Sequence, residues 1–259
     1  MKGAPKIDEA TSGGGAALVI YLPVGYPSLD ASVEAAKVAI DEGADIIEFG
    51  LPYSDPGMDG PIIAAATAQT LKSGFRVAEL FGAVERVSGR GAAIEVMTYI
   101  NPVFRYGYRR FAQDLASAGG AGLITPDLIP EEAGEWIEAA DEFDLDKIFL
   151  VAQSSREERL RLISDQSRGF VYAASTMGVT GDRSQVDAGA RDLVERTRAA
   201  GAQRVCLGLG ISTGDQAREV AGYADGAIVG TAGIRAIQAD PSLGAFRKLI
   251  GELKAGVAC

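Results

Sequence analysis

The chain contains no histidine among its 259 residues, and this absence removes several kinds of catalytic site. Serine–histidine–aspartate and cysteine–histidine catalysis, histidine-ligated zinc and imidazole acid–base chemistry all need that side chain. Any proton transfer therefore falls to aspartate, glutamate, tyrosine, lysine or cysteine. The two cysteines, Cys206 and Cys259, are too few for a disulfide framework and fit a reducing compartment.

Basic charge and long apolar runs are also scarce. The 25 Lys and Arg residues are outnumbered by 35 Asp and Glu residues, so the excess of positive charge that nucleic acid or an anionic membrane attracts is missing. No apolar run approaches the roughly 20 residues of a membrane helix, and residues 1–15 lack the apolar core of a signal peptide. We therefore expect a cytoplasmic protein with no nucleic-acid or membrane partner. One small phosphate stays compatible, since backbone N–H groups bind it without net charge.

What the sequence does contain is a series of eight short apolar runs. Each is nearly continuous rather than alternating, which is typical of strands buried on both faces of a parallel sheet. The eight runs are Ala17–Pro23, Ala44–Gly50, Ala93–Tyr99, Ala121–Thr125, Lys147–Ala152, Gly169–Ala174, Arg204–Gly210 and Asp225–Gly230.

Segments with helical periodicity lie between these runs. They are predicted over residues 31–43, 77–89, 111–120, 131–143, 156–166, 189–201 and 215–224, and several end at a capping glycine such as Gly43, Gly119 or Gly201. Eight strand–helix units in about 250 residues predict an α/β fold, a single (β/α)8 TIM barrel of eight parallel strands with its active site on the C-terminal loops. An open doubly wound sheet is the alternative. The expected organisation is a polar, glycine-rich segment over residues 1–15 followed by one catalytic barrel domain over 16–259.

Two acidic residues follow the second predicted strand. Glu48 is embedded in the apolar run that ends this strand, and Asp59 lies eleven residues later in a loop rich in Gly, Pro and Asp. A buried carboxyl without a partner has a raised pKa and exchanges protons near neutral pH. Glu48 could equally be neutralised by a buried Lys, Arg or backbone donor. Either Asp55 or Asp59 could serve only the turn.

Glycine-rich stretches follow the last three predicted strands. They cover residues 177–181, 208–212 and 229–232, and they combine glycine with Thr or Ser hydroxyls, the composition of a phosphate cradle. Phosphate sites after strands seven and eight recur in such barrels, so we expect a phosphorylated small molecule, with Gly208 among its contacts. Tyr99 and Tyr172, at the third and sixth strands, are candidate substrate contacts, with core packing as the alternative.

At these residues the sequence resembles the tryptophan synthase alpha subunit family. The segments that carry the resemblance occur in family order between about Tyr21 and Ile237, and the first of them is the most specific. They read IEFGLPYSDPGMDGP, MTYINPVFRYG, TPDLIPEEA, STMGVTGDR, GLGIS and VGTA.

The resemblance implies a reaction and a role for individual residues. Members of the family are (β/α)8 barrels that cleave indole-3-glycerol phosphate to indole and glyceraldehyde 3-phosphate. The family's catalytic Glu and Asp match Glu48 and Asp59, its substrate-contacting Tyr matches Tyr172, and Thr180 matches a residue that bonds the catalytic Asp when the loop over residues 175–186 closes. The remaining matches are phosphate contacts at Gly181, Gly210, Gly230 and Thr231.

The resemblance also implies a partner. Indole passes to a beta subunit that holds pyridoxal phosphate, in an expected alpha2-beta2 tetramer, and the alpha chain needs no cofactor or metal of its own. Two segments, PYSDP and NPVFRYG, match regions that meet the beta subunit. The alternatives are a regulatory barrel that binds the phosphate ligand without chemistry, a free-standing indole-producing lyase, and a sugar-phosphate isomerase or epimerase.

Three features depart from the family pattern. The family has an amphipathic N-terminal helix that closes the barrel bottom, whereas residues 2–15 here are polar, end in three glycines and offer few apolar side chains for such packing. Thr231 stands where Ser is more usual, which keeps the hydroxyl. Residues 62–64, Ile-Ile-Ala, replace a segment that often bears a polar residue.

Overall fold

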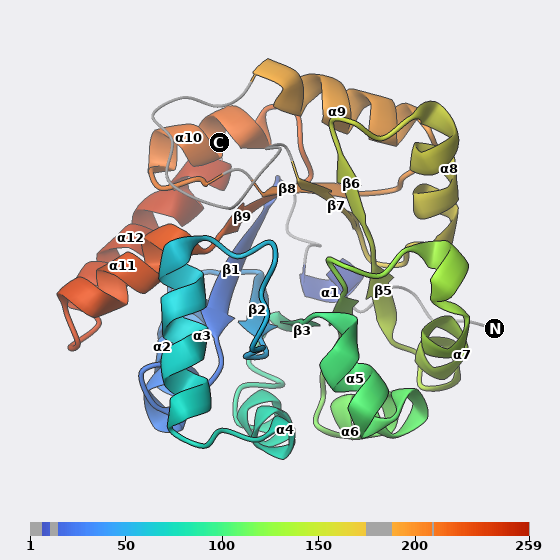
Figure 1. Cartoon of the computed structure of the whole chain (residues 1–259). Helices are drawn as coiled ribbons and strands as arrows, with labels where there is room; N and C mark the ends of the chain where they lie inside the picture. The colour runs from blue at the N-terminus through green and yellow to red at the C-terminus, as the bar shows by residue number, and fades with distance from the viewer. Residues whose placement is uncertain (1–6, 11–14, 175–187, 209, 259) are drawn as a thin grey trace.

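In the computed structural model, which describes residues 7–10, 15–174, 188–208 and 210–258, nine parallel strands form one sheet that curves into a nearly closed barrel (Figure 1). The sheet order is β5-β4-β3-β2-β1-β9-β8-β7-β6. The strands are β1 (Ala17–Pro23), β2 (Ile46–Gly50), β3 (Ala93–Met97), β4 (Gly122–Ile124), β5 (Asp146–Ile148), β6 (Leu150–Ala152), β7 (Val171–Ala174), β8 (Val205–Gly208) and β9 (Gly226–Val229).

Pairing between the first and last strands confirms the barrel over the open doubly wound sheet. Val19 of β1 pairs with Ile228 of β9 and, on its other side, with Ile46 of β2. The fifth predicted run, Lys147–Ala152, was expected to form one strand but forms two, β5 and β6, which are divided at Phe149. β5 bonds to β4 and β6 bonds to β7, so this run changes neighbours where the ring closes. The Phe149 carbonyl accepts the Tyr172 N–H at 3.0 Å across that junction.

Helices surround the ring, and the seven predicted helical segments are confirmed. Gly43, Gly119 and Gly201 follow helix ends with φ of 100°, 86° and 112°, the left-handed region that a capping glycine supplies. None of the helices in the described residues is long and apolar enough to cross a membrane. The helices are α1 (Ile7–Ala10), α2 (Leu29–Asp41), α3 (Pro61–Lys72), α4 (Val77–Glu85), α5 (Ile100–Tyr106), α6 (Tyr108–Ser117), the 3-10 helix η1 (Pro130–Glu132), α7 (Gly134–Glu142), α8 (Glu157–Gln166), α9 (Ala188–Ala199), α10 (Gly214–Ala221), α11 (Thr231–Ala239) and α12 (Gly244–Val257).

The strands are buried on both faces because they separate two apolar cores. Along β2, Ile47 and Phe49 join the large cluster shared with the helices, while Ile46 joins a smaller cluster inside the barrel. Successive strand side chains point to opposite faces, so both faces of one strand need apolar residues. This explains why the runs in the sequence are continuous.

The N-terminal end of the barrel interior is closed partly by α1. Ile7 is fully buried and belongs to the inner cluster, and the neighbouring Asp8 forms an ion pair with Arg204. The polar segment before β1 thus contributes at least one side chain to the barrel bottom. The predicted domain boundary between residues 15 and 16 stays a prediction.

Candidate active site

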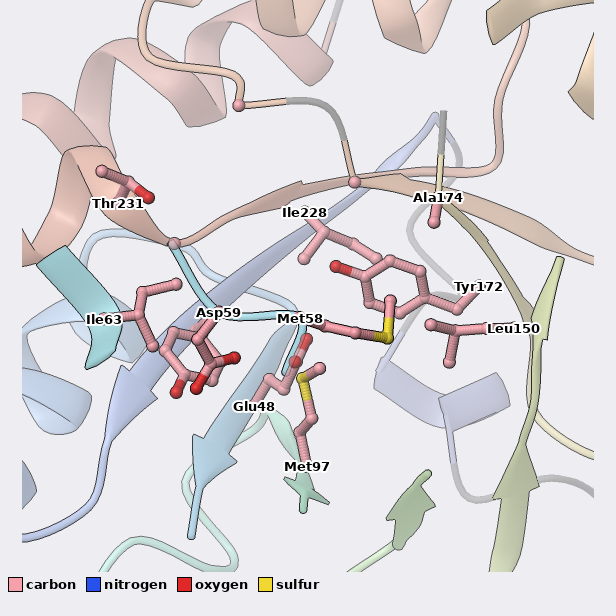
Figure 2. Close-up of a pocket in the computed structure, with 14 residues that line it drawn as sticks. Glu48, Met58, Asp59, Ile63, Met97, Leu150, Tyr172, Ala174, Ile228 and Thr231 are labelled. Carbon is pink, nitrogen blue, oxygen red and sulfur yellow. The ribbon is translucent and has the colours of Figure 1, made fainter. Parts of the chain in front are cut away.

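A pocket opens at the C-terminal ends of the strands, and seven of the ten residues predicted from the sequence line it (Figure 2). Those seven are Glu48, Asp59, Tyr172, Gly208, Gly210, Gly230 and Thr231. Thr180 and Gly181, and with them the predicted lid over residues 175–186, lie outside the described residues. Tyr99 does not line the pocket within the described chain, although its hydroxyl reaches the loop that does.

Glu48 points into the barrel and has no compensating cation there. Alternation along β2 sends Ile47 and Phe49 outward to the helices, so Glu48 faces inward like Ile46. Its side chain is 1% exposed, and its Oε2 atom makes no hydrogen bond to any described residue. Among the described residues, no ion pair or backbone donor neutralises it. The sequence left two interpretations of Glu48 open, and the structure supports the buried carboxyl aimed at the pocket.

The surroundings of Glu48 change its acidity. Burial, and to a lesser extent the nearby Asp59 carboxylate, together raise its pKa from 4.5 to about 8. Both effects disfavour a second negative charge in a poorly solvated cavity. Glu48 therefore carries a proton at neutral pH and can act as an acid.

Asp59 reaches the same cavity from the loop between β2 and α3. Its backbone N–H donates to the Pro56 carbonyl at 3.4 Å, and Gly60 then caps α3, whose first residue is Pro61. Burial raises the pKa of Asp59 to about 6, while a hydrogen bond from Tyr99 lowers it. At neutral pH Asp59 is therefore mostly ionised. The turn role that either acid in this loop could have filled suits Asp55, which is exposed and accepts a bond from Ser54 Oγ at 2.6 Å.

Two tyrosines, Tyr172 and Tyr21, share the pocket with these acids. Tyr172 lies on β7 opposite Glu48 and Asp59, with its ring directed into the cavity (Figure 2). A Cβ at Gly208 would lie 2.4 Å from the Tyr172 hydroxyl, so glycine at this position makes room for the ring. Tyr21 on β1 packs in the same way against Gly50. Burial raises the pKa of both phenols well above 10, so both hydroxyls keep their protons.

The glycines after β8 and β9 form the far wall of the pocket. Gly230 is the N-terminal cap of α11, and Thr231 is its first residue. The first N–H groups of a helix have no partner within it and favour an anion. No acidic residue lies in the first turn of α11, and no Lys or Arg is among the pocket-lining residues that the structure describes. An anion here would be held by backbone N–H groups and the Thr231 hydroxyl.

The apolar part of the pocket and Tyr21 were not predicted from the sequence. The side chains that complete the lining within the described chain come from seven different elements or loops. Inward strand positions identify several of them once the register is known: Tyr21 pairs with Glu48, and Leu150 pairs with Tyr172. The missed residues are Tyr21, Met58, Ile63, Met97, Leu150, Ala174 and Ile228.

The pocket combines the protonated Glu48, the ionised Asp59 and a wall of apolar side chains. The described residues offer no cluster of three His, Cys, Asp or Glu side chains that could hold a metal ion. Its two carboxyls have pKa values of about 8 and about 6, which differ because their surroundings differ. Such a divided pair is typical of acid–base catalysis.

Comparisons with known proteins agree over nearly the whole chain. A family model described as tryptophan synthase alpha chain matches residues 7–253. The tryptophan synthase alpha chain of Mycobacterium intracellulare is 53% identical over 98% of this chain and 93% of that relative, and the one from Bifidobacterium longum is 53% identical over 86% and 77%. A structure of Mycobacterium tuberculosis tryptophan synthase superposes with a TM-score of 0.94 at 52% identity, over 99% of this chain and 100% of the matched chain. The chain belongs to the tryptophan synthase alpha chain family.

Proposed function

We propose that this protein is a carbon–carbon lyase that cleaves indole-3-glycerol phosphate to indole and glyceraldehyde 3-phosphate, as the alpha subunit of tryptophan synthase. The observation that carries the proposal is the pair of pocket carboxyls. Glu48 is buried and protonated at neutral pH, Asp59 is mostly ionised, and the two face one cavity. A regulatory barrel without chemistry would gain nothing from this division.

Glu48 carries the proton in both halves of the retro-aldol reaction. It first donates its proton to C3 of the indole ring, which places positive charge on the ring nitrogen. The resulting carboxylate then removes the proton from the side-chain hydroxyl next to the ring. As the aldehyde forms, the electrons of the breaking carbon–carbon bond return to the ring and neutralise the nitrogen. Glu48 ends the cycle protonated, so no external acid or base is consumed.

Asp59 stabilises the charge that develops between these steps. A fixed carboxylate near the ring nitrogen lowers the energy of the cationic intermediate, and the effect is large in a site that excludes water. Asp59 can do this at neutral pH because its pKa is about 6 rather than 8. Met58, Ile63 and Met97 supply apolar contacts for the bicyclic ring.

The glycine wall is proposed to bind the phosphate of the substrate. The first N–H groups of α11, the Thr231 hydroxyl and the backbone at Gly208 and Gly210 border the pocket at one side. Gly181 and Thr180 join this assignment from the sequence resemblance, and Tyr172 is the proposed contact for the middle of the substrate. Backbone donors suit this chain, whose pocket offers no described Lys or Arg.

Membership in the family implies a beta-subunit partner. We propose the fuller arrangement expected from the sequence: an alpha2-beta2 tetramer in the cytoplasm, pyridoxal phosphate held by the beta subunit, and indole passed to it. Two large apolar side chains, in α5 after β3 and in the loop after β4, support a surface that docks the beta subunit: Phe104 is 63% exposed and Ile129 is 43% exposed. Size measurement of the mixed subunits tests the stoichiometry.

Indole release from indole-3-glycerol phosphate tests the activity, with Glu48→Gln as the decisive variant. Glutamine keeps the size of the side chain but cannot carry the proton, so turnover should fall at least ~10²-fold while the circular dichroism spectrum is unchanged. Glu131→Gln is the matched control, because Glu131 is an exposed carboxyl paired with Arg159. Wild-type turnover by Glu48→Gln would contradict the mechanism. Assays with and without the beta subunit separate a dependent subunit from a free-standing lyase.

A further inference from the structure

One phenol hydroxyl holds two consecutive residues of the loop that carries Asp59. The Met58 N–H donates to the Tyr99 hydroxyl at 2.8 Å, and that hydroxyl donates to Asp59 Oδ1 at 3.4 Å. A hydroxyl has one proton, so accepting from Met58 leaves that proton for Asp59. Burial raises the pKa of Tyr99 to about 12, which keeps the proton in place.

Tyr99 is itself fixed by the barrel. It is 6% exposed and directly precedes α5, between Thr98, whose N–H bonds to the Ile124 carbonyl at 3.1 Å, and Ile100, whose N–H bonds to Asp127 Oδ1 at 2.9 Å. These bonds tie both neighbours of Tyr99 to the end of β4 and the loop that follows it. The hydroxyl of Tyr99 is therefore presented from a rigid position.

The Tyr99 ring also has a partner within the catalytic loop. It stacks on Tyr53 with centroids 5.2 Å apart and an interplanar angle of 29°. The Tyr53 hydroxyl in turn accepts a bond from Asn101 Nδ2 at 3.2 Å. The loop is thus attached to the start of α5 at two points, through the Tyr53 ring and through the Met58–Asp59 backbone and carboxylate.

Asp59 depends on this attachment. Within the described chain, Tyr99 is the one residue that donates a hydrogen bond to the Asp59 carboxylate. Residues 54 and 55 of the same loop are exposed, and the loop is rich in Gly and Pro. A carboxylate on such a loop needs an outside anchor to keep one orientation.

We propose that Tyr99 is a positioning residue, which holds the Asp59 carboxylate toward the pocket rather than contacting the substrate itself. The role rests on the proposed function, because Asp59 matters only if charge develops on the ring. The hydrogen bond from Tyr99 to Asp59 is long at 3.4 Å, as catalytic hydrogen bonds often are without substrate, and we expect it to shorten when charge develops on the ring. A small displacement of a catalytic group lowers turnover by up to ~10²-fold.

Tyr99→Phe tests the proposal, because phenylalanine keeps the buried ring and the stack on Tyr53 while removing the hydroxyl. We expect kcat to fall about 10-fold with KM changed less than about 2-fold, since Asp59 acts on charge that forms only in the transition state. Tyr26→Phe is the matched control. It removes another tyrosine hydroxyl that takes part in a hydrogen bond, accepting from Gln238 Nε2 at 3.0 Å, at a place that does not line the pocket. Its kinetic constants should equal those of the wild type.

A titration of the Asp59 carboxyl by carbon-13 NMR gives a readout that does not need activity. Loss of the Tyr99 bond should raise the Asp59 pKa in Tyr99→Phe, because that bond lowers it in the wild type. An unchanged kcat together with an unchanged Asp59 titration would overturn the positioning role. A raised KM at constant kcat would overturn it too, and would instead make Tyr99 a direct substrate contact. If Asp59→Asn keeps normal turnover, the proposed function fails, while the NMR shift still reports whether Tyr99 holds Asp59.

Discussion

The two ends of the barrel interior bury carboxyl groups in opposite ways. At the C-terminal end, Glu48 and Asp59 face a pocket with no cation among the described lining residues. At the N-terminal end, the fully buried Asp146 lies 3.2 Å from Arg168 Nε, and Asp8 pairs with Arg204. The same barrel therefore leaves charge uncompensated at one end and neutralises it at the other.

The paired carboxyls at the N-terminal end and the unpaired carboxyls at the pocket end differ in what burial does to them. In a buried ion pair, attraction between the partners offsets part of the desolvation cost, and removing one partner is strongly unfavourable. An uncompensated carboxyl instead answers burial with a raised pKa, and that pKa makes it a proton carrier at neutral pH. At neutral to alkaline pH, the unpaired carboxyl of Glu48 thus lowers folding stability, because no partner offsets its desolvation.

The largest expected effect comes from breaking a pair at the N-terminal end. Arg168→Met removes the guanidinium that contacts both Asp146 and Asp144, the latter at 2.8 Å. It leaves Asp146 buried beside an apolar side chain, and the free energy of unfolding should fall by about 3 kcal/mol. Urea denaturation measures this loss. Turnover per folded molecule should be unchanged, because the pair lies at the end opposite the pocket.

The matched control for that prediction is an exposed pair of similar length. Arg86 lies 2.8 Å from Asp30, with the two side chains 41% and 87% exposed. Arg86→Met should cost less than about 1 kcal/mol, because water already solvates both charges. Equal losses in the two variants would show that Arg168 contributes nothing beyond a surface contact.

An effect of opposite sign and comparable size is expected at the pocket end. The pKa of Glu48 rises from 4.5 in the unfolded chain to about 8 in the folded protein, so the folded state binds the extra proton between these values. Stability of the wild type therefore decreases as pH rises through this window. Glu48→Gln removes that dependence and should stabilise the protein at pH 8 to 9 by on the order of 2–4 kcal/mol.

Thermal unfolding of Glu48→Gln and wild type between pH 5 and 9 checks this. The difference should be small at pH 5 and grow with pH. Glu131→Gln should show no such gain, since the Arg159 bond lowers the pKa of Glu131 and its carboxylate is favoured in the folded state. If the stability of Glu48→Gln and wild type differed by the same amount at every pH, the pKa of Glu48 would not be raised in the folded protein.

The barrel could be predicted from the sequence because its signal is local. Continuous apolar runs and capping glycines such as Gly43 report on a few neighbouring residues at a time. The division at Phe149 could not be predicted, because it depends on which strands pair as the ring closes. Ile7 was also not predicted to enter the barrel, since one apolar residue in a polar segment carries no periodic signal.

The site was predictable in part for the same reason. Glu48 stood out as a charge within an apolar run, but its inward direction depends on the register that pairs it with Tyr21. The bond from Tyr99 to Asp59 joins residues 40 positions apart, and no local pattern marks it. The family resemblance supplied roles for Asp59 and Thr231 that spacing alone left open. It did not reveal the apolar wall that Met97 and Leu150 complete.

The finest test of the contrast is the pH dependence of kcat/KM. The proposed mechanism requires an ionised Asp59 and a protonated Glu48 in the free enzyme, and their pKa values are about 6 and about 8. The profile of kcat/KM against pH should be a bell with its maximum near pH 7. It should fall up to tenfold per pH unit below the lower pKa and above the higher pKa.

Because the two carboxyls interact, the acid and alkaline limbs of this profile belong to the pair rather than to either residue alone. Asp59→Asn should therefore remove the acid limb and also move the alkaline limb to lower pH, since the Asp59 charge is one cause of the raised pKa of Glu48. An acid limb that survives in Asp59→Asn would assign it to another group, whereas Arg168→Met, at the paired end, should leave both limbs in place.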